Sequence, residues 1–515
     1  MPSSLEDCRR AFLPTIPKAL RDILRLGFSP ERAPIVDEEI LSLLPRLGKH
    51  QVCSCTHEAS SGRREPLRIG LFFSGGPAPG GHNVVTGLFD ALQKWNRKST
   101  LVGFLDGPLG LLKNASKELV REEIDAIRNT GGFSLLGTGR EKIESEEEIS
   151  KAADVVCRQR LDGLVCIGGD DSNTDAAFIA EAFLKKKIQT CVVGVPKTID
   201  GDLTSPDIAL SFGFDTACKV YSCTIGDIAR DCLSTKRQYF FIRLMGRCAS
   251  HITLECALRT QPNLALIGEE VSSRTMSLRD VVSQITDLVE ERHRCGREFG
   301  VILVPEGLIE QMADLRALIA ELNGLFASSS EPCRCTRNTA DALKEPSRRF
   351  LLSLPPTIQE QLVIERDPHG NVHVSQIDTA RLLALAAQKE LSTRGIPFTF
   401  QTAFCGYEGR SAFPSDFDCT YCYALGRLSA LMIAKKMTGY MAAIRDLHQE
   451  PSKWTPAAVP LASLLHFERR GGRRLPVIQK RLVDLSGPAF RRFAEGRELW
   501  RLGDQYLQPG PIQFG

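Results

Sequence analysis

Short apolar runs alternate along most of the chain with longer stretches in which apolar residues recur at helical spacing. Short apolar runs are typical of buried strands, and a period of about 3.6 residues indicates amphipathic helices. The predicted strands are residues 68–73, 101–105, 163–167, 190–195, 239–244, 264–268 and 299–304. The predicted helices are residues 83–96, 117–129, 147–160, 174–187, 214–232, 249–259, 278–292, 378–392 and 416–436. Strands that alternate with helices predict an α/β fold, with mostly parallel sheets covered by helices on both faces.

Three segments depart from this alternation. Residues 1–66 are predicted to form a helical extension that ends in a polar linker at 60–64. Residues 326–376 contain a serine run and several prolines, which predict an insertion of loops and short helices. Residues 471–515 are basic and interrupted by glycine and proline, and we expect a tail that packs on the main body.

Length and composition narrow the class of protein. A chain of 515 residues exceeds the ~250–300 residues at which a single core stops growing, so we expect at least two domains. The chain has 65 Lys plus Arg against 62 Asp plus Glu, a formal charge of +3 that does not favour a dedicated nucleic-acid binder. The longest apolar runs are far shorter than the ~20 residues that span a bilayer, and the N-terminus does not resemble a signal peptide. We therefore expect a cytoplasmic protein with neither nucleic acid nor membrane as a partner.

The 17 cysteines agree with a reducing compartment, because they are odd in number and no export signal accompanies them. Three close pairs raise the question of zinc: Cys53/Cys55, Cys333/Cys335 and Cys419/Cys422. Only the last pair has C-x-x-C spacing, and no second pair of that kind follows it. A structural zinc site needs four ligands, so we expect ordinary thiols at all three places.

The loop after the first predicted strand, residues 74–83, reads Ser-Gly-Gly-Pro-Ala-Pro-Gly-Gly-His-Asn. Its glycines let backbone amides approach an anion, and the helix that follows contributes its positive end. The loop is neither a Walker A motif nor a dinucleotide-binding fingerprint. The two interpretations left open are phosphate binding and a tight strand-to-helix turn.

The loop after strand 163–167 contains two glycines followed by Asp170 and Asp171. Asp170 is well placed to hold Mg²⁺, which takes one or two carboxylates and leaves its other positions to substrate phosphates. The alternative is that Asp171 or Ser172 caps the next helix, and both interpretations can hold at once.

The loop after strand 190–195 carries Lys197, Asp200 and Asp202. A carboxylate there can take the proton from an attacking hydroxyl, and a lysine can neutralise charge on a transferring phosphoryl group. Arg140 and Arg247 each follow a glycine at the end of a loop or strand, and arginine is suited to bidentate phosphate contact. The alternative for all of these is an ordinary surface ion pair.

Taken together, six motifs resemble the phosphofructokinase family, and more narrowly its long, pyrophosphate-dependent branch. They lie at residues 74–83, 168–174, 196–202, 244–247, 304–307 and 406–410. The resemblance implies phosphoryl transfer from diphosphate to the 1-hydroxyl of fructose 6-phosphate, with Mg²⁺ as the cofactor. It also implies two Rossmann-like three-layer lobes besides the 1–66 extension. On that analogy lobe one is 67–211 with 409–470, and lobe two is 212–408 with 471–515.

The resemblance further implies roles for particular residues. On the diphosphate side these are Gly76, Arg140, Asp171 and Lys197, with Asp170 as the magnesium ligand. Asp200 is the base that activates the 1-hydroxyl, and Lys197 and Arg247 stabilise the transferring group. The implied sugar-phosphate residues are Thr198, Ile199, Asp200, Asp202, Met245, Gly246, Arg247, Glu306, Tyr407, Glu408, Gly409 and Arg410. Arg237 and Gln238 match a position that the family contributes from a neighbouring subunit, where Lys-Tyr is frequent, so a homo-oligomer (dimer or tetramer) with a shared site is expected.

Two positions bear on the phosphoryl donor. Members of the family that use ATP carry glycine where this chain has Asp171, and glycine where it has Lys197. A carboxylate at 171 would occupy the room of a nucleotide's α-phosphate and repel it, so diphosphate is favoured over ATP. An ATP-dependent kinase and a catalytically weak regulatory subunit are the two alternatives; the second is disfavoured because Asp170, Asp200, Asp202 and Arg247 are all present.

Overall fold

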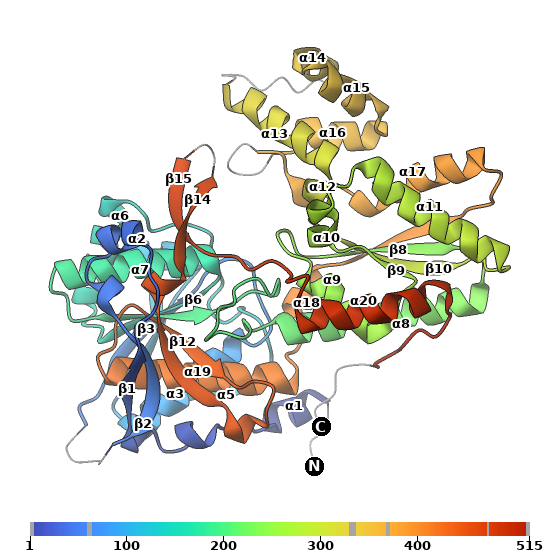
Figure 1. Cartoon of the computed structure of the whole chain (residues 1–515). Coiled ribbons are helices and arrows are strands. Elements are labelled where there is room, and N and C mark those ends of the chain that lie inside the picture. Colours follow the sequence, from blue (N-terminus) through green and yellow to red (C-terminus); the bar gives the residue numbers. More distant parts are fainter. Residues whose placement is uncertain (1–4, 59–63, 329–335, 367–370, 471–472, 511–515) are drawn as a thin grey trace. The chain divides into compact units, whose positions relative to one another are not determined.

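The computed structural model describes residues 5–58, 64–328, 336–366, 371–470 and 473–510 (Figure 1). The pair Cys333/Cys335 and most of the predicted 60–64 linker lie outside these residues. The chain divides into two compact units. Unit 1 comprises the residues up to Ala217 together with Tyr407–Arg481, and unit 2 comprises Cys218–Gly406 together with the residues that follow from Leu482.

Within the described residues, unit 1 is built on a nine-stranded sheet. The strand order is β1 (Leu26–Arg32), β2 (Val52–His57), β13 (Thr455–Pro460), β12 (Tyr440–Arg445), β7 (Cys191–Pro196), β6 (Gly163–Gly168), β3 (Arg68–Phe73), β4 (Thr100–Phe104) and β5 (Ser116–Glu118). The five strands from β12 to β4 run parallel, and the strands at both margins pair antiparallel. Strands β6 and β7 are buried throughout, as expected for parallel strands covered on both faces.

Helices cover both faces of this sheet (Figure 1). On one side α3 (Gly81–Trp95) and α19 (Asp416–Ala434) pack against each other so closely that each needs a glycine. A Cβ on Gly87 would lie 2.2 Å from the Tyr423 carbonyl oxygen, and one on Gly426 would lie 2.1 Å from that of Val84. On the other side lie α6 (Glu146–Arg158) and α7 (Asp170–Lys185), and α7 begins directly after β6.

Unit 2 contains a four-stranded, fully parallel sheet in the order β11 (Phe400–Cys405), β8 (Tyr239–Leu244), β10 (Gly300–Pro305) and β9 (Leu264–Ala265). Its main helices are α8 (Phe214–Thr235), which begins in unit 1, and α9 (His251–Thr260), α11 (Leu278–Arg294), α17 (Thr379–Thr393) and α20 (Pro488–Leu502). Between β10 and α17 come α13 (Ala313–Ser328), α14 (Thr336–Ala342), α15 (Glu345–Ser353) and α16 (Pro356–Ile364), whose apolar residues extend the core of unit 2.

The predicted α/β class with mostly parallel sheets is confirmed, and the insertion within 326–376 contains the expected short helices. The prediction of a helical extension at 1–66 is wrong in part, because β1 and β2 lie there and form one margin of the large sheet. Strand β1 is buried only at its first two residues and contains a proline and two charged residues. Edge strands often have such sequences, which hide the alternating pattern of a half-buried strand.

Two further predictions need correction. The helix predicted at 117–129 is in fact the end of β5 followed by a short helix, α5 (Arg121–Ala126). The strand predicted at 264–268 is only two residues long, because Gly268 begins α10 (Gly268–Ser273).

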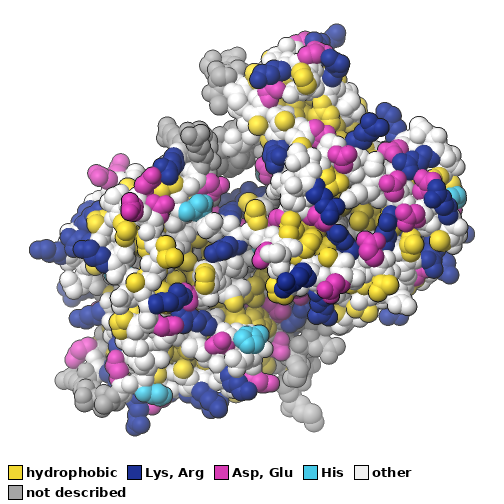
Figure 2. Space-filling model, in the orientation of Figure 1, with side chains coloured by type: hydrophobic (Ala, Val, Ile, Leu, Met, Phe, Trp, Pro, Cys, Tyr) yellow, Lys and Arg dark blue, Asp and Glu magenta, His cyan; other side chains and the backbone are white. Residues whose placement is uncertain are grey.

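The surface agrees with the small formal charge. In the view of Figure 2, Lys and Arg side chains are interspersed with Asp and Glu over the visible face. Among the described helices, none combines the length and the apolar character that a bilayer crossing requires.

Candidate active site

The predicted residues of unit 1 lie at the carboxyl ends of neighbouring strands. Gly76 follows β3, Asp170 follows β6 and Lys197 follows β7. Strand β3 pairs with β4 on one side and with β6 on the other, so the loops after β3 and β6 leave the sheet in opposite directions. In open α/β sheets such a reversal of strand order creates the crevice in which ligands bind.

Three cations gather around the turn at Gly76. The Lys197 ammonium donates a hydrogen bond to the Gly76 carbonyl oxygen at 2.9 Å. A Cβ on Gly76 would lie 3.2 Å from the Arg410 guanidinium carbon, so the absence of a side chain lets this arginine pack on the backbone. Gly76, Arg140 and Arg410 also line a cavity of about 290 Å³. Positive side chains that converge on a glycine turn suit a small phosphate anion.

The pKa of Lys197 reflects this crowding. Burial, which disfavours the charged ammonium, lowers the pKa of Lys197 to about 8, and the positive charge of Arg410 adds to the effect. The carboxylates of Asp200 and Asp170 act in the opposite direction. An anion bound in the cavity would favour the charged lysine, so the cluster is best satisfied by a ligand with several negative charges.

Two carboxylates lie beside the cation cluster and share a lysine that sequence reasoning missed. The Lys480 ammonium is 3.4 Å from Asp170 Oδ2 and 4.0 Å from Asp202 Oδ2. Burial and, after it, the charge of Asp200 together raise the pKa of Asp202 to about 7. Since Lys480 lies more than three hundred positions after Asp170, no local motif connects them; only the fold brings them together.

The loop from Thr198 to Asp202 is held by its own polar groups. The Asp200 amide donates to Thr198 Oγ1 at 3.1 Å, and the Ser211 hydroxyl donates to the Thr198 carbonyl oxygen. Ile199 is buried and anchors the loop, whereas Asp200 is half-buried. The buried anchor and the hydrogen bonds fix the backbone from which the Asp200 carboxylate projects.

Asp171 lies at the start of α7, where its side chain is exposed. Burial raises the pKa of Asp175 to about 7, whereas burial lowers the pKa of Lys142 and the Glu144 carboxylate raises it by more. The charge of Asp171 adds to both upward effects. Asp171 is not among the residues that line the cavity at Gly76. The structure therefore brings Gly76, Arg140, Lys197 and Arg410 into one cluster and places Asp171 outside the cavity.

The motif at 406–410 forms the short helix α18 (Tyr407–Ser411). Tyr407 and Glu408 are exposed and Gly409 is buried. The guanidinium carbon of Arg410 is 5.7 Å from the centroid of the Tyr407 ring, a distance compatible with a cation–π contact. Tyr407 and Arg410 thus both contribute to the cavity at Gly76.

In unit 2, the predicted residues after β8 and β10 also meet at the carboxyl ends of adjacent strands. The Gly246 amide donates to Glu306 Oε2 at 3.0 Å, and the Gly307 amide donates to the Gly246 carbonyl oxygen at 3.2 Å. Glu306 and Met245 are buried, and Arg247 is exposed. The backbone of one turn therefore fixes the orientation of the Glu306 carboxylate.

Arg237 and Gln238 lie at the other end of the same strand, because they precede β8 whereas Met245 follows it. Six strand residues span roughly 20 Å, so within one copy of unit 2 these two side chains are far from Glu306. Arg237 is exposed.

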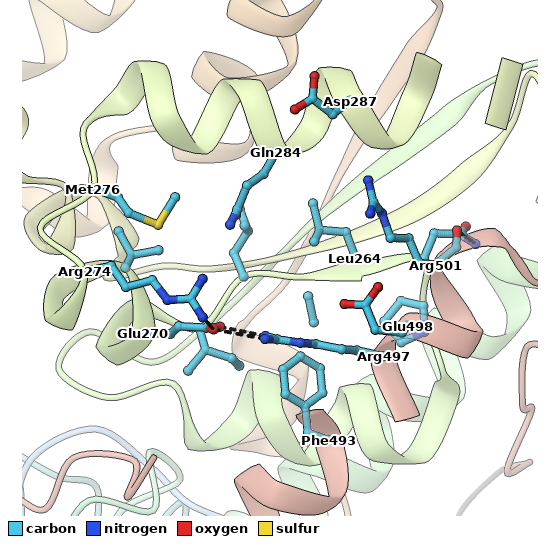
Figure 3. Close-up of a pocket in the computed structure, with 16 residues that line it drawn as sticks. Leu264, Glu270, Arg274, Met276, Gln284, Asp287, Phe493, Arg497, Glu498 and Arg501 are labelled. Atoms are coloured by element: carbon cyan, nitrogen blue, oxygen red, sulfur yellow. Dashed lines mark hydrogen bonds and ion pairs between the residues drawn. The ribbon is translucent and has the colours of Figure 1, made fainter. Parts of the chain in front are cut away.

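Unit 2 has a cavity of its own, of about 310 Å³, that no sequence motif indicated. It lies between β9, α11 and α20, and Figure 3 shows two of its arginines pointing at Glu270. Arg497 binds this carboxylate through two nitrogens at 2.8 and 3.1 Å, and Arg274 does so at 2.8 Å. None of the predicted site residues lines this cavity.

Across the described residues, no three His, Cys, Asp or Glu side chains are grouped closely enough to hold a metal ion by themselves. The cysteine pairs 53/55 and 419/422 are free thiols. A metal at Asp170 would therefore need ligands of other kinds as well, such as water or phosphate oxygens.

Comparison with known proteins identifies the class. Residues 68–349 match the family model described as Phosphofructokinase, and this chain belongs to the phosphofructokinase family. The chain is 44% identical to the pyrophosphate–fructose 6-phosphate 1-phosphotransferase of Treponema pallidum, over 99% of this chain and 94% of that protein. It is 46% identical to the beta 2 subunit of the enzyme of that name in Arabidopsis thaliana, over 93% and 85%. The family predicted from the motifs, with its pyrophosphate-dependent branch, is confirmed.

Solved structures support the fold. The pyrophosphate-dependent phosphofructokinase of Nitrosospira multiformis matches with a TM-score of 0.58 at 16% identity, over 87% of this chain and 95% of that chain. The phosphofructokinase of Pichia pastoris matches with a TM-score of 0.53 at 19% identity, over 78% of this chain and 36% of that chain. At such low identity the likeness concerns the fold alone.

Proposed function

We propose that this chain catalyses the reversible transfer of a phosphoryl group from diphosphate to the 1-hydroxyl of fructose 6-phosphate. The products are fructose 1,6-bisphosphate and phosphate, and the step belongs to glycolysis and gluconeogenesis. The observation that carries the proposal is the cluster of Lys197, Arg140 and Arg410 around Gly76, at the end of a sheet that also holds Asp170. Relatives that this chain matches over almost their whole length carry the name of this activity, and this supports the proposal.

Mg²⁺ is the proposed cofactor, and the residues present fit it. Asp170 and Asp202 already hold one positive charge, the Lys480 ammonium, within 4.0 Å of a carboxylate oxygen of each. Mg²⁺ prefers oxygen ligands and commonly takes one or two carboxylates, with water and phosphate oxygens in its other positions. Asp170 would hold the ion; bound there, it would neutralise charge on the diphosphate.

The residues of unit 1 act mainly by positioning and by charge. Lys197, Arg140 and Arg410 offset the repulsion between the two anionic substrates, which is the principal task in phosphoryl transfer. Asp200 removes the proton from the 1-hydroxyl as that oxygen attacks the phosphorus. The anchored backbone at Thr198 and Ile199 keeps this carboxylate in place.

Unit 2 contributes recognition of the sugar phosphate. Glu306 accepts hydrogen bonds from sugar hydroxyls, and Met245 and Gly246 form the surface beneath the ring. Arg247 stabilises the transferring group. Tyr407 and Arg410 are the residues proposed to contact the phosphate of the sugar. The buried, oriented carboxylate of Glu306 supports this assignment, since a fixed acceptor discriminates a hydroxyl from its absence.

We further propose a homo-oligomer, dimer or tetramer, in which Arg237 and Gln238 complete the site of a neighbouring copy. The position of both residues at the far end of β8 supports this, since one copy cannot bring them to Glu306. Mixed oligomers of Arg237→Ala and Asp200→Ser chains should recover activity, because some sites would receive an intact copy of each residue. Hybrids that exchange subunits but stay inactive would contradict the shared site. The expected compartment is the cytoplasm.

The test of the proposed function is a coupled assay with the purified chain, fructose 6-phosphate, Mg²⁺ and either diphosphate or ATP. Turnover with diphosphate should exceed turnover with ATP by ~10²-fold or more, because a carboxylate near the donor disfavours an α-phosphate. The Asp200→Ser chain is the inactive control. Better turnover with ATP would identify an ATP-dependent kinase, and no turnover with either donor would identify a regulatory subunit.

A further inference from the structure

The segment that follows the hairpin of β14 (Leu465–Arg470) and β15 (Arg473–Ile478) carries Lys480 to the carboxylates of unit 1. The segment is fixed on both sides of the lysine, to α7 on one side and to the loop that carries Asp202 on the other. Before it, the Ile478 amide donates to Thr174 Oγ1 at 3.1 Å, and Thr174 Oγ1 donates to the Asp170 carbonyl oxygen at 2.9 Å. After it, the Arg481 amide donates to the Asp202 carbonyl oxygen at 2.7 Å.

These backbone hydrogen bonds restrict where the Lys480 side chain can lie. Its ammonium is 3.4 Å from Asp170 Oδ2 and 4.0 Å from Asp202 Oδ2, and its side chain is only 25% exposed. The Lys480 ammonium thus serves as a counter-ion of Asp170 and Asp202.

A magnesium ion bound to Asp170 Oδ2 would lie about 2.0–2.1 Å from that oxygen. An ammonium that stayed 3.4 Å from the same oxygen would then face a doubly charged ion at short range. Two cations at such a distance repel strongly where water is scarce. The ammonium and the metal therefore compete for Asp170, unless an anion arrives that can hold both.

We propose that Lys480 is an internal counter-ion of the metal position and makes metal binding depend on the anionic donor. In the metal-free chain the ammonium holds Asp170 and Asp202. With metal and donor both bound, Asp170 would hold the metal and the Lys480 ammonium would contact a donor phosphate oxygen. This inference rests on the proposed function for the place of the metal, but it concerns a residue that none of the sequence motifs contains.

The geometry explains why a lysine suits this role. Its charge is compact, and its flexible stem of four methylene groups lets the ammonium turn from a carboxylate to a phosphate without moving the backbone. The backbone stays in place because its amides at 478 and 481 are bound to Thr174 and Asp202. Removal of the ammonium would take one positive charge away from Asp170 and Asp202, which favours a metal there.

The experiment measures binding of Mn²⁺, as a spectroscopic probe for the divalent site, by electron paramagnetic resonance on the full-length chain. Wild-type chain and Lys480→Met are titrated with Mn²⁺ alone and with Mn²⁺ plus methylenediphosphonate, a donor analogue that cannot transfer its phosphoryl group. Without the analogue, Lys480→Met should bind Mn²⁺ about tenfold more tightly than wild type, because one opposing charge is gone. With the analogue the difference should shrink or reverse, because the ammonium then contributes to holding the anion.

Three variants make the result specific. Lys480→Arg keeps the charge and should bind Mn²⁺ within about threefold of wild type. Lys151→Met removes a charge of the same sign from the surface of α6, where Lys151 pairs with Glu147, and should leave Mn²⁺ affinity unchanged. Asp170→Asn added to Lys480→Met should abolish the gain.

The outcomes separate this inference from the proposed function. Equal Mn²⁺ affinity in wild type and Lys480→Met overturns the counter-ion role, as does an equal gain in Lys480→Arg, whereas the coupled assay with diphosphate decides the activity independently. A gain that survives Asp170→Asn would place the metal elsewhere and also overturns the inference. Thermal unfolding gives a second measurement: without metal Lys480→Met should melt below wild type, and added Mn²⁺ should raise its melting temperature more.

Discussion

The two sheets of the molecule place their candidate residues in the same way but give them opposite chemistry. In both units a glycine-containing turn follows one parallel strand, and charged residues follow its neighbour. In unit 1 the turn at Gly76 is surrounded by Lys197, Arg410 and Arg140, whereas in unit 2 the turn at Gly246 binds the carboxylate of Glu306.

This difference indicates how one architecture serves two kinds of ligand. A turn surrounded by cations suits phosphate oxygens, which only accept hydrogen bonds. A turn with a fixed carboxylate suits hydroxyl groups, which can donate. The parallel strands supply the positions, and a few side chains at their carboxyl ends decide what is bound.

The largest expected effect comes from the base in the loop after β7. Asp200→Ser should lower kcat by ~10²–10⁴, because the 1-hydroxyl would lose its proton acceptor. Binding of diphosphate, measured by calorimetry, should change little, since the cluster at Gly76 is intact. Asp200→Asn is the matched control and should lose as much activity while it preserves the size of the side chain. Near-normal turnover in either variant would remove Asp200 from the mechanism.

The second largest effect should be a change in donor preference. Asp171→Gly should change the ratio of diphosphate to ATP efficiency by ~10²-fold in favour of ATP, because like charges near an α-phosphate cost several kcal/mol. Asp171→Asn removes the charge but keeps the bulk, so comparison of kcat/KM for both donors in the two variants separates the effects. Because Asp171 lies outside the cavity at Gly76, the outcome tests whether a residue beyond this cavity selects the donor. An unchanged ratio in both variants would mean that another residue selects the donor.

Loss of the Glu306 charge should affect fructose 6-phosphate and leave diphosphate largely unaffected. Glu306→Gln should raise KM for fructose 6-phosphate about tenfold, since hydrogen bonds to a charged group contribute about 1.5–3 kcal/mol. KM for diphosphate should stay within about twofold of wild type if the two turns work on different ligands. Glu310→Gln, a few residues further along in α12 (Leu308–Gln311), is the matched control. Equal effects on both substrates would break the division between the two units.

The smallest effect should be a change in pH dependence. Because the pKa of Lys197 in the free chain is about 8, its charge is present below that pH and is lost as the pH rises through it. The kcat/KM for diphosphate should therefore fall by a few-fold above about pH 8, and less so kcat, because a bound anion keeps the lysine charged. Lys197→Arg should remove this decline, since arginine stays protonated in this range. A decline that persists in Lys197→Arg would assign it to another group.

How far the sequence predicts the molecule differs between its regions. The buried parallel strands at 68–73 and 239–244 were predicted to the residue, because strands covered on both faces are continuous apolar runs. The sequence pattern does not predict β1, β2, β5 or β11 to β15. Apart from β12, these strands lie toward the margins of the two sheets or in a separate hairpin, and polar residues or prolines interrupt the pattern in β1, β13 and β15.

The candidate site divides in the same manner. Gly76, Asp170 and Lys197 could be identified because glycines and charges directly after buried strands form local motifs. Lys480 could not be identified, because only a hairpin that folds back onto α7 brings it to Asp170. The side chains that short motifs leave unexplained are thus the ones that come from distant segments.

The N-terminal margin of the large sheet has a practical consequence for handling the protein. Strand β13 pairs with β2 through Ala457 and Ala458, and β1 covers β2 in turn. A chain shortened to begin near residue 64 would leave β13, which is buried over most of its length, as an open edge with unpaired backbone groups. Open apolar edges recruit further strands, so such a chain should aggregate during expression even though the candidate residues are all present.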